Sequence, residues 1–357
     1  MFAQHGCEQS VLLEEGAGRV ATLPILVLNV HSRCNCRCVM CDIWRRRETN
    51  AITVADIERH RESLRRLRVE WVVLSGGEPL MNGDLPGLCV FLRELGIRMT
   101  LLTTGLLLAR RATEVAALFD DIIVSMDGPM AVHDAIRQIK GSFDLIQSGV
   151  AAVRGLRPEM PITARLTVQK MNHAHLLEAV LSARAIGLDG ISFLAADLTS
   201  HAFNRPLLWA TERQKEIALT ETETAVLERE IERVLAWGAE GENQGYVAES
   251  AAKLQKIAAH FRACLGQAAF ESPKCNAPSV SAVVEADGTV RPCFFHPAVG
   301  NIHQDTLEEI VNGEAARNFR ERLDVESNPV CQRCVCALHR DDSLRDAVPA
   351  SRDVPLR

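Results

Sequence analysis

The chain has 357 residues, of which 47% are hydrophobic, and its formal net charge is −6. This length is enough for a barrel of roughly 200 to 250 residues and one smaller domain. The negative charge gives no reason to expect a nucleic acid as partner, and no apolar run of about 18 residues predicts a membrane-spanning helix. The N-terminus lacks the basic-then-apolar order of a signal peptide, so we expect a soluble, cytoplasmic protein.

Twelve cysteines are present, and most of them are gathered at two places in the chain. Reducing cytoplasm would not maintain many disulfides, so this grouping favours metal ligation.

The first predicted strand covers residues 24–30, which are apolar, short and rich in β-branched side chains. It follows an N-terminal stretch with little pattern and reads as a buried parallel strand. Its carboxyl end leads into a loop that carries Cys34, Cys38 and Cys41 in a C-x3-C-x2-C spacing. Three thiolates on one loop can hold three irons of a [4Fe-4S] cluster, which leaves the fourth iron open to another ligand.

Strands and helices then alternate, which indicates parallel βαβ units. Six strands are too few for a closed eight-stranded barrel. Including the first, the predicted strands are 24–30, 70–75, 98–103, 121–126, 162–169 and 190–195, and the predicted helices are 53–67, 84–95, 111–119, 143–154, 175–185 and 213–237.

The character of the sequence changes after this region. Residues 238–245 are rich in Gly and Glu and read as a linker, and a helix is predicted over 248–263. Asp287 and Gly288 lie between two apolar runs and predict a hairpin with a tight two-residue turn.

The C-x3-C-x2-C loop after a first strand resembles the radical S-adenosylmethionine (radical SAM) enzymes. The resemblance implies an α/β fold, a partial (β/α)6 barrel, in which the open iron binds SAM and the reduced cluster cleaves it to a 5′-deoxyadenosyl radical. Met40 stands where the family usually has an aromatic residue and can still pack beside an adenine. Cys36 does not fit the spacing. The alternative is a zinc-binding or redox cysteine cluster.

The same resemblance implies several contacts to SAM. Gly76, Gly77 and Glu78 resemble the family's GGE motif, which binds the methionine amino group. Ser125 lies in a segment resembling S-x-D-G, and Arg165 could reach the SAM carboxylate. The alternatives are an ordinary turn, a helix cap provided by Asp127 and a buried ion pair, respectively.

A second group of cysteines lies near the C-terminus. It resembles the SPASM and twitch domains, although a full SPASM pattern needs more cysteines, and it implies one auxiliary [4Fe-4S] cluster. A structural zinc site is the alternative. The expected ligands are Cys275, Cys293, Cys331 and Cys334, with Cys336 as the competing fourth ligand.

The domains expected from these patterns are an N-terminal extension (1–22), the partial barrel (23–237), a linker and helix (238–264), a SPASM/twitch-like auxiliary cluster domain (265–340) and a mobile tail (341–357).

The expected activity is hydrogen-atom abstraction from a small biosynthetic intermediate, leading to oxidation, epimerisation or rearrangement. The alternatives are a maturase that modifies a ribosomally made peptide or protein, and a non-catalytic metal-binding protein. The partners would be the substrate and an external reductant such as flavodoxin or ferredoxin. His201 and Arg205 follow the sixth strand and are candidate substrate contacts, with a solvated loop as the plainer interpretation.

Overall fold

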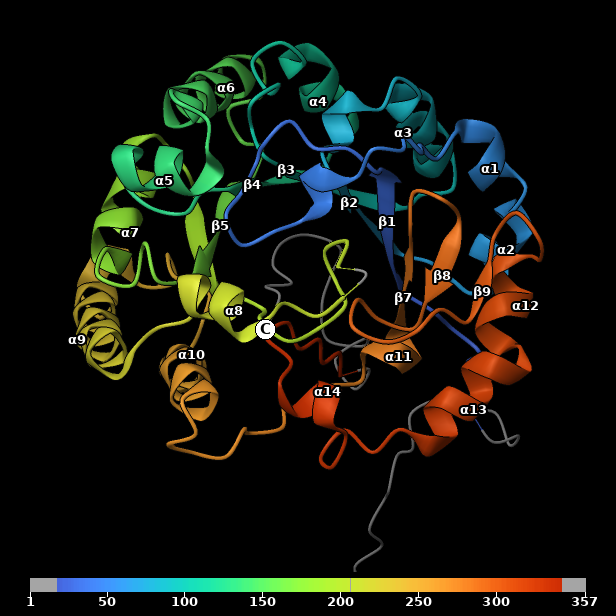
Figure 1. Ribbon diagram of the computed structural model, residues 1–357. Helices are drawn as coiled ribbons and strands as arrows, with labels where there is room; N and C mark the ends of the chain where they lie inside the picture. The colour runs from blue at the N-terminus through green and yellow to red at the C-terminus, as the bar shows by residue number, and fades with distance from the viewer. Residues whose placement is uncertain (1–17, 206, 342–357) are drawn as a thin grey trace, which may run out of the picture.

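Six parallel strands form the wall of a half-barrel in the computed structural model, which describes residues 18–205 and 207–341 (Figure 1). Neighbouring strands pair in the order β6-β5-β4-β3-β2-β1, and the sheet continues past β1 into the C-terminal strands β7-β8-β9. The bounds are β1 Ile25–His31, β2 Trp71–Gly76, β3 Arg98–Thr103, β4 Asp121–Ser125, β5 Ile162–Val168, β6 Gly190–Ala195, β7 Ser281–Val284, β8 Thr289–Arg291 and β9 Gly300–Asn301.

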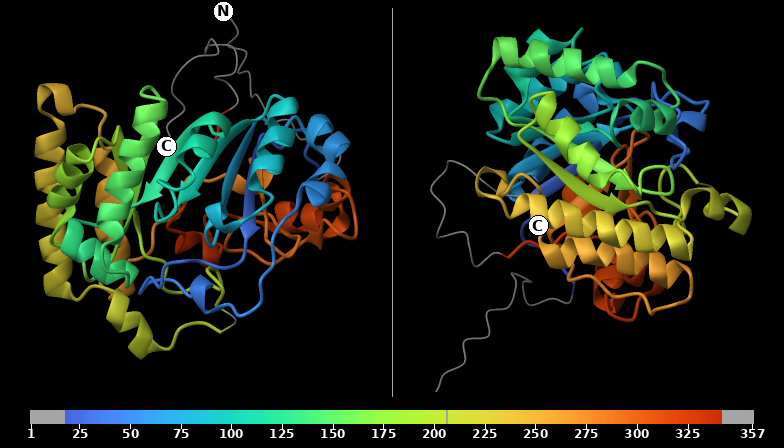
Figure 2. Two further views of the ribbon diagram at one scale, coloured as in Figure 1. Left: turned by 90° about the horizontal axis from the view of Figure 1, so that it is seen from above. Right: turned by 90° about the vertical axis from the view of Figure 1, so that its left-hand side faces the viewer.

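The helices of the barrel other than α8 lie on its outer side and cover the sheet in an arc from α1 to α10 (Figures 1 and 2). Helix α8 lies inside this arc in Figure 1, against Val39 of the first cysteine loop. The buried faces of the outer helices and the strands share one large apolar core. The helices are α1 Val54–Glu58, α2 Arg61–Arg66, α3 Leu85–Glu94, α4 Ala112–Leu118, α5 Met130–Arg137, α6 Ser142–Leu156, α7 Leu176–Ala185, α8 Thr211–Ile217, α9 Glu221–Gly238, α10 Ala251–Cys264, α11 Ala277–Val280, α12 Leu307–Asn312, α13 Glu314–Arg322 and α14 Pro329–Gln332. Short 3-10 turns are η1 Ile43–Arg45, η2 Pro79–Met81 and η3 Gly241–Asn243.

All six barrel strands lie where the alternating pattern predicts them, within one residue at each end. Two predicted helices are each divided in two, since 53–67 forms α1 and α2, and 213–237 forms α8 and α9. The first division has a visible cause at His60. Its ring nitrogens bond the Ile302 carbonyl and the Leu307 N–H, so the side chain anchors the break to the C-terminal region.

The C-terminal hairpin differs from the prediction at its turn. Glu285 N–H still donates to the Thr289 carbonyl at 2.8 Å, so three residues, and not two, make the loop. Only Gly288 in this loop has a positive φ, of 81°. This is the pattern of a three-residue loop closed by a left-handed glycine.

The hairpin also continues the barrel sheet. Strand β7 pairs in parallel with β1, from Ile25 opposite Ser281 to Leu28 opposite Val284. The C-terminal region is therefore joined to the barrel at the strand that delivers the cysteine loop. Within the described residues no helix is long and apolar enough to cross a membrane, and the predicted tail lies outside the described residues except for Asp341.

Candidate active site

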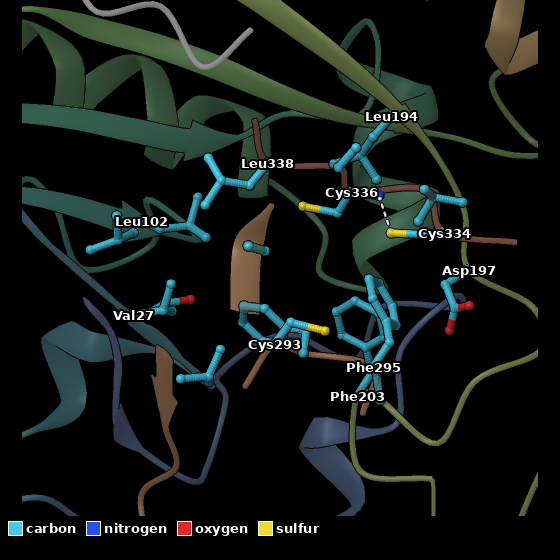
Figure 3. Close-up of a pocket in the computed structure, with 18 of the residues that line it drawn as sticks. Val27, Leu102, Leu194, Asp197, Phe203, Cys293, Phe295, Cys334, Cys336 and Leu338 are labelled. Carbon is cyan, nitrogen blue, oxygen red and sulfur yellow. Dashed lines mark hydrogen bonds between the residues drawn. The ribbon is translucent and has the colours of Figure 1, made fainter. Parts of the chain in front are cut away.

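One cavity of about 1960 Å³ opens inside the half-barrel and reaches the C-terminal hairpin. Its lining combines strand residues such as Val27 and Leu102 with Cys293 and Phe295 of the C-terminal region (Figure 3). Both groups of predicted ligand cysteines line it. The cavity runs along the inside of the barrel, from Trp71 and Arg98 at the amino ends of their strands to the carboxyl ends, where the first cysteine loop lies.

The first cysteine loop brings Cys34, Cys38 and Cys41 to the cavity wall. The Cys34 sulfur accepts the Cys36 N–H at 3.5 Å, and the Cys41 sulfur accepts the Ile43 N–H at 3.4 Å. Backbone N–H groups directed at sulfur stabilise thiolates. The pKa of Cys38 is lowered to about 7, first by a hydrogen bond with the Cys36 thiol and also by the charge of Arg137.

Cys36 itself is 1% exposed and lies outside the cavity lining. Cys36 is therefore a buried neighbour of the three predicted ligands, in agreement with its position outside the C-x3-C-x2-C spacing.

The glycines of the GGE segment hold the cysteine loop against the end of β2. A Cβ on Gly77 would lie 2.0 Å from the Arg33 carbonyl oxygen, so no other residue fits there. Gly77 N–H donates to the His31 carbonyl at 2.8 Å. Gly76 and Gly77 line the cavity and expose backbone groups to it.

Glu78 is fully buried and is not part of the cavity lining. Its carboxylate accepts hydrogen bonds from Leu80 N–H at 3.0 Å, the Thr103 hydroxyl at 2.8 Å and Thr104 N–H at 2.7 Å. These donors all belong to the protein, so the side chain fixes the ends of β2 and β3 in this structure and does not offer a free acceptor to a ligand.

The other predicted SAM contacts gather around the cavity. Met40, Ser125 and Arg165 all line it. Arg165 Nε donates to the Ser192 hydroxyl at 2.6 Å, which orients its guanidinium. The structure thus brings five of the six predicted SAM contacts to one space, the exception being Glu78.

Residues 197–205 and 207–210, after β6, lie against the cysteine loop; we call them the strap. Arg205 is 2% exposed and donates to Asp197 Oδ2 at 2.6 Å and to the Met40 carbonyl at 3.2 Å. Its guanidinium carbon lies over the Trp209 ring, 3.7 Å from the ring centroid. Trp209 Nε1 in turn donates to Asp42 Oδ2 at 2.6 Å.

Arg205 is thus buried and anchors the loop, so the solvated-loop interpretation does not apply to it, and its side chain also lines the cavity. His201 does line the cavity.

The C-terminal cysteines form the second site. Cys275, Cys293, Cys331, Cys334 and Cys336 all line the cavity, and Figure 3 shows Cys293, Cys334 and Cys336 reaching into the same part of it. The Cys334 sulfur accepts the Cys336 N–H at 3.4 Å, and His296 Nε2 lies 3.3 Å from the Cys331 sulfur. Burial raises the pKa values of Cys293 and Cys331 to about 11.

The donor set of both sites is of the kind that iron-sulfur clusters use, because cysteine thiolates are their usual ligands and each site brings at least three cysteines to the cavity wall. In the described ranges, no group of three or more His, Cys, Asp or Glu side chains is arranged around a single-ion position.

Two cavity residues were not predicted from the sequence. Glu249 accepts the Phe193 N–H at 2.9 Å, and burial raises its pKa. Glu249 follows the predicted linker (238–245). Two residues before it, Val247 forms an isolated parallel β-bridge with Ile191 of β6. His260 lies on α10, and burial lowers its pKa to about 4, which keeps the imidazole neutral. No local pattern distinguishes either residue from a solvated side chain.

The half-barrel and its three-cysteine loop define a radical SAM enzyme. A radical SAM superfamily model matches residues 28–192, and an iron-sulfur cluster-binding SPASM model matches residues 275–335. The chain belongs to the radical SAM superfamily and carries a C-terminal SPASM iron-sulfur domain. SAM and a [4Fe-4S] cluster are thus its cofactors, and the SPASM domain implies at least one auxiliary cluster.

Similar proteins include two from Methanosarcina barkeri. The chain is 27% identical to an AdoMet-dependent heme synthase over 326 residues, which cover 85% of this chain and 87% of that protein. It is 31% identical to an Fe-coproporphyrin III synthase over 159 residues, 42% of this chain but only 38% of that protein. The crystal structure of Streptococcus suis SuiB bound to S-adenosylmethionine has a TM-score of 0.63 at 15% identity and covers 89% of this chain and 73% of SuiB, which shows a shared fold.

Proposed function

We propose that this enzyme abstracts a hydrogen atom from a tetrapyrrole that carries carboxylate groups. The observation that carries the proposal is the match along 87% of an AdoMet-dependent heme synthase, a small-molecule enzyme by its name. The size of the cavity agrees with it, because about 1960 Å³ exceeds the 300–1,000 Å³ typical of pockets for one small ligand. SAM and a macrocycle together need such a volume.

The cavity wall has the chemistry that such a substrate requires. Val27, Leu102, Phe203, Phe295 and Leu338 present apolar and aromatic surface to it (Figure 3). Flat macrocycles bind against such surface. Lys253 and Lys274 also line the cavity and can pair with substrate carboxylates.

We assign the cofactor sites within this proposal. Cys34, Cys38 and Cys41 would hold the cluster that binds SAM, with Met40, Ser125, Arg165 and the backbone of Gly76 and Gly77 around the cosubstrate. When bound, cluster and SAM supply the 5′-deoxyadenosyl radical that attacks the substrate C–H bond. The C-terminal cysteines would hold one auxiliary [4Fe-4S] cluster, formed by Cys275, Cys293 and Cys331 with Cys334 or Cys336. The proposed units remain 23–237 for the barrel and 265–340 for the auxiliary domain.

A binding and turnover experiment tests the substrate class. The anaerobically reconstituted protein is titrated with iron-coproporphyrin III and with its tetramethyl ester, in which every carboxylate is blocked. We expect the free acid to bind at least about tenfold more tightly, a difference of about 1.4 kcal/mol. With dithionite, titanium(III) or reduced flavodoxin as reductant, 5′-deoxyadenosine should form in proportion to tetrapyrrole consumed.

The control is the Cys34, Cys38 and Cys41 triple alanine variant, which should bind the tetrapyrrole and not cleave SAM. Equal binding of acid and ester, or SAM cleavage unaffected by the tetrapyrrole, would refute the proposal. Cleavage stimulated by a ribosomal precursor peptide instead would support the peptide maturase considered from the sequence.

A further inference from the structure

A buried guanidinium lies between the end of β4 and the first cysteine loop. Arg137, the last residue of α5, has 8% of its side chain exposed. Its Nε lies 2.6 Å from Oδ2 of Asp127, whose side chain is fully buried, although this N–H is not aligned for a hydrogen bond. The other carboxylate oxygen of Asp127 accepts the Thr167 N–H at 3.1 Å, so β5 fixes the acid in place.

The remaining edge of this guanidinium faces a predicted cluster ligand. Arg137 Nη1 donates to the Cys38 sulfur at 3.4 Å. The backbone reinforces the contact on both sides of Cys38, because Arg37 N–H donates to the Arg137 carbonyl at 3.1 Å and Val39 N–H to the Ile136 carbonyl at 3.0 Å. Three hydrogen bonds therefore hold the end of α5 against the cysteine loop.

The charges make this contact chemically consequential. Asp127, Arg137 and a Cys38 thiolate form a buried row of alternating sign, in which the guanidinium satisfies two anions. Removing the cation would leave the other two buried and uncompensated. Arg37, one residue before Cys38, carries the same charge but is exposed, so water screens it.

We propose that Arg137 is a positioning residue for the SAM-binding cluster: held by Asp127, it fixes the Cys38 thiolate and favours the reduced form of the cluster through its charge. Hydrogen bonds and charge next to ligand sulfurs set cluster potentials, and a reduced cluster carries one more negative charge for Arg137 to stabilise. The electron comes from an external low-potential reductant. This inference rests on membership of the radical SAM superfamily and does not depend on the tetrapyrrole proposal.

The experiment compares redox titrations of the SAM-binding cluster by electron paramagnetic resonance in reconstituted full-length protein. This signal is distinguished from that of an auxiliary cluster by its response to SAM. The variants are Arg137→Gln, which removes the charge, Arg137→Lys, which keeps it, and the matched control Arg37→Gln. Iron and sulfide content and far-UV circular dichroism are measured for each, and no tetrapyrrole is present.

We expect Arg137→Gln to shift the one-electron equilibrium at least about tenfold toward the oxidised cluster, a midpoint about 59 mV lower. Arg37→Gln should leave the midpoint at the wild-type value. A loaded Arg137→Gln variant with the same midpoint as Arg37→Gln would overturn the proposal. If Arg137→Gln does not load iron at this site, Arg137→Lys decides: restored loading supports the role of the charge, and a variant that also stays empty overturns it.

Discussion

At the scale of single residues, the glycines and the glutamate of the GGE segment have different positions relative to the cavity. Gly76 and Gly77 line the cavity, whereas the carboxylate of the neighbouring Glu78 is fully buried and accepts four hydrogen bonds. A buried carboxylate with every oxygen bonded stabilises the turn that presents the glycines. In this structure the segment presents its backbone to the cavity, and its acid supports that backbone from the buried side.

Glu78→Ala should lower the free energy of unfolding by about 3 kcal/mol, because it leaves the Thr103 and Thr104 donors buried without an acceptor. Anaerobic urea unfolding followed by circular dichroism measures this, with the exposed Glu62→Ala as a control expected within about 0.5 kcal/mol of wild type. The opposite result, unchanged stability with SAM affinity lost, would show that the Glu78 carboxylate binds the methionine ammonium group.

At the scale of elements, the strap secures the loop that carries Cys34, Cys38 and Cys41. The side chains of Asn204, Arg205 and Trp209 donate hydrogen bonds to the loop. Phe203 of the strap also stacks on Phe294 beside Cys293, at 6.4 Å between ring centres. The strap thus touches both cysteine sites. The buried ion pair of Arg205 and Asp197 holds the strap in place.

Asp197→Ala should destabilise the protein by about 3 to 5 kcal/mol, since it leaves the Arg205 charge buried and unpaired. Hydrogen exchange measured by mass spectrometry should become faster in peptides covering residues 38–46, where Arg205 and Trp209 hold the loop. Glu242→Ala breaks a surface pair with Arg184 and serves as the control, with an effect below about 1 kcal/mol. Unchanged exchange in the loop would mean that the strap does not restrain it.

At the scale of the whole molecule, several contacts join the barrel to the SPASM region. The two regions share a sheet through β1 and β7, and the N-terminal side of the chain is fastened to α12, where Val20 N–H donates to the Asn312 side chain at 2.9 Å. His60 makes two further bonds to the same region. The unpaired edge of β1 would otherwise be an aggregation site.

A chain ending at residue 264 should therefore be recovered mostly in the insoluble fraction, and any soluble part should bind the dye ANS. A chain ending at Asp341 keeps every described element and should remain soluble. Soluble expression and iron content measure the outcome. A soluble 264-residue protein carrying four irons would show that the barrel folds independently of the SPASM region.

The sequence alone determined the alternating strands and helices and the two cysteine groups, because both depend on local periodicity and on spacing within short segments. It could not determine contacts between distant segments. Arg137 lies 99 residues from Cys38, and the Asn29 side chain bonds Glu285 over a separation of 256 residues. The burial of Glu78, the broken helices and the pairing of β7 with β1 depend on such contacts. Their energies arise only once the chain is packed, which is why tertiary structure decided how the site is supported.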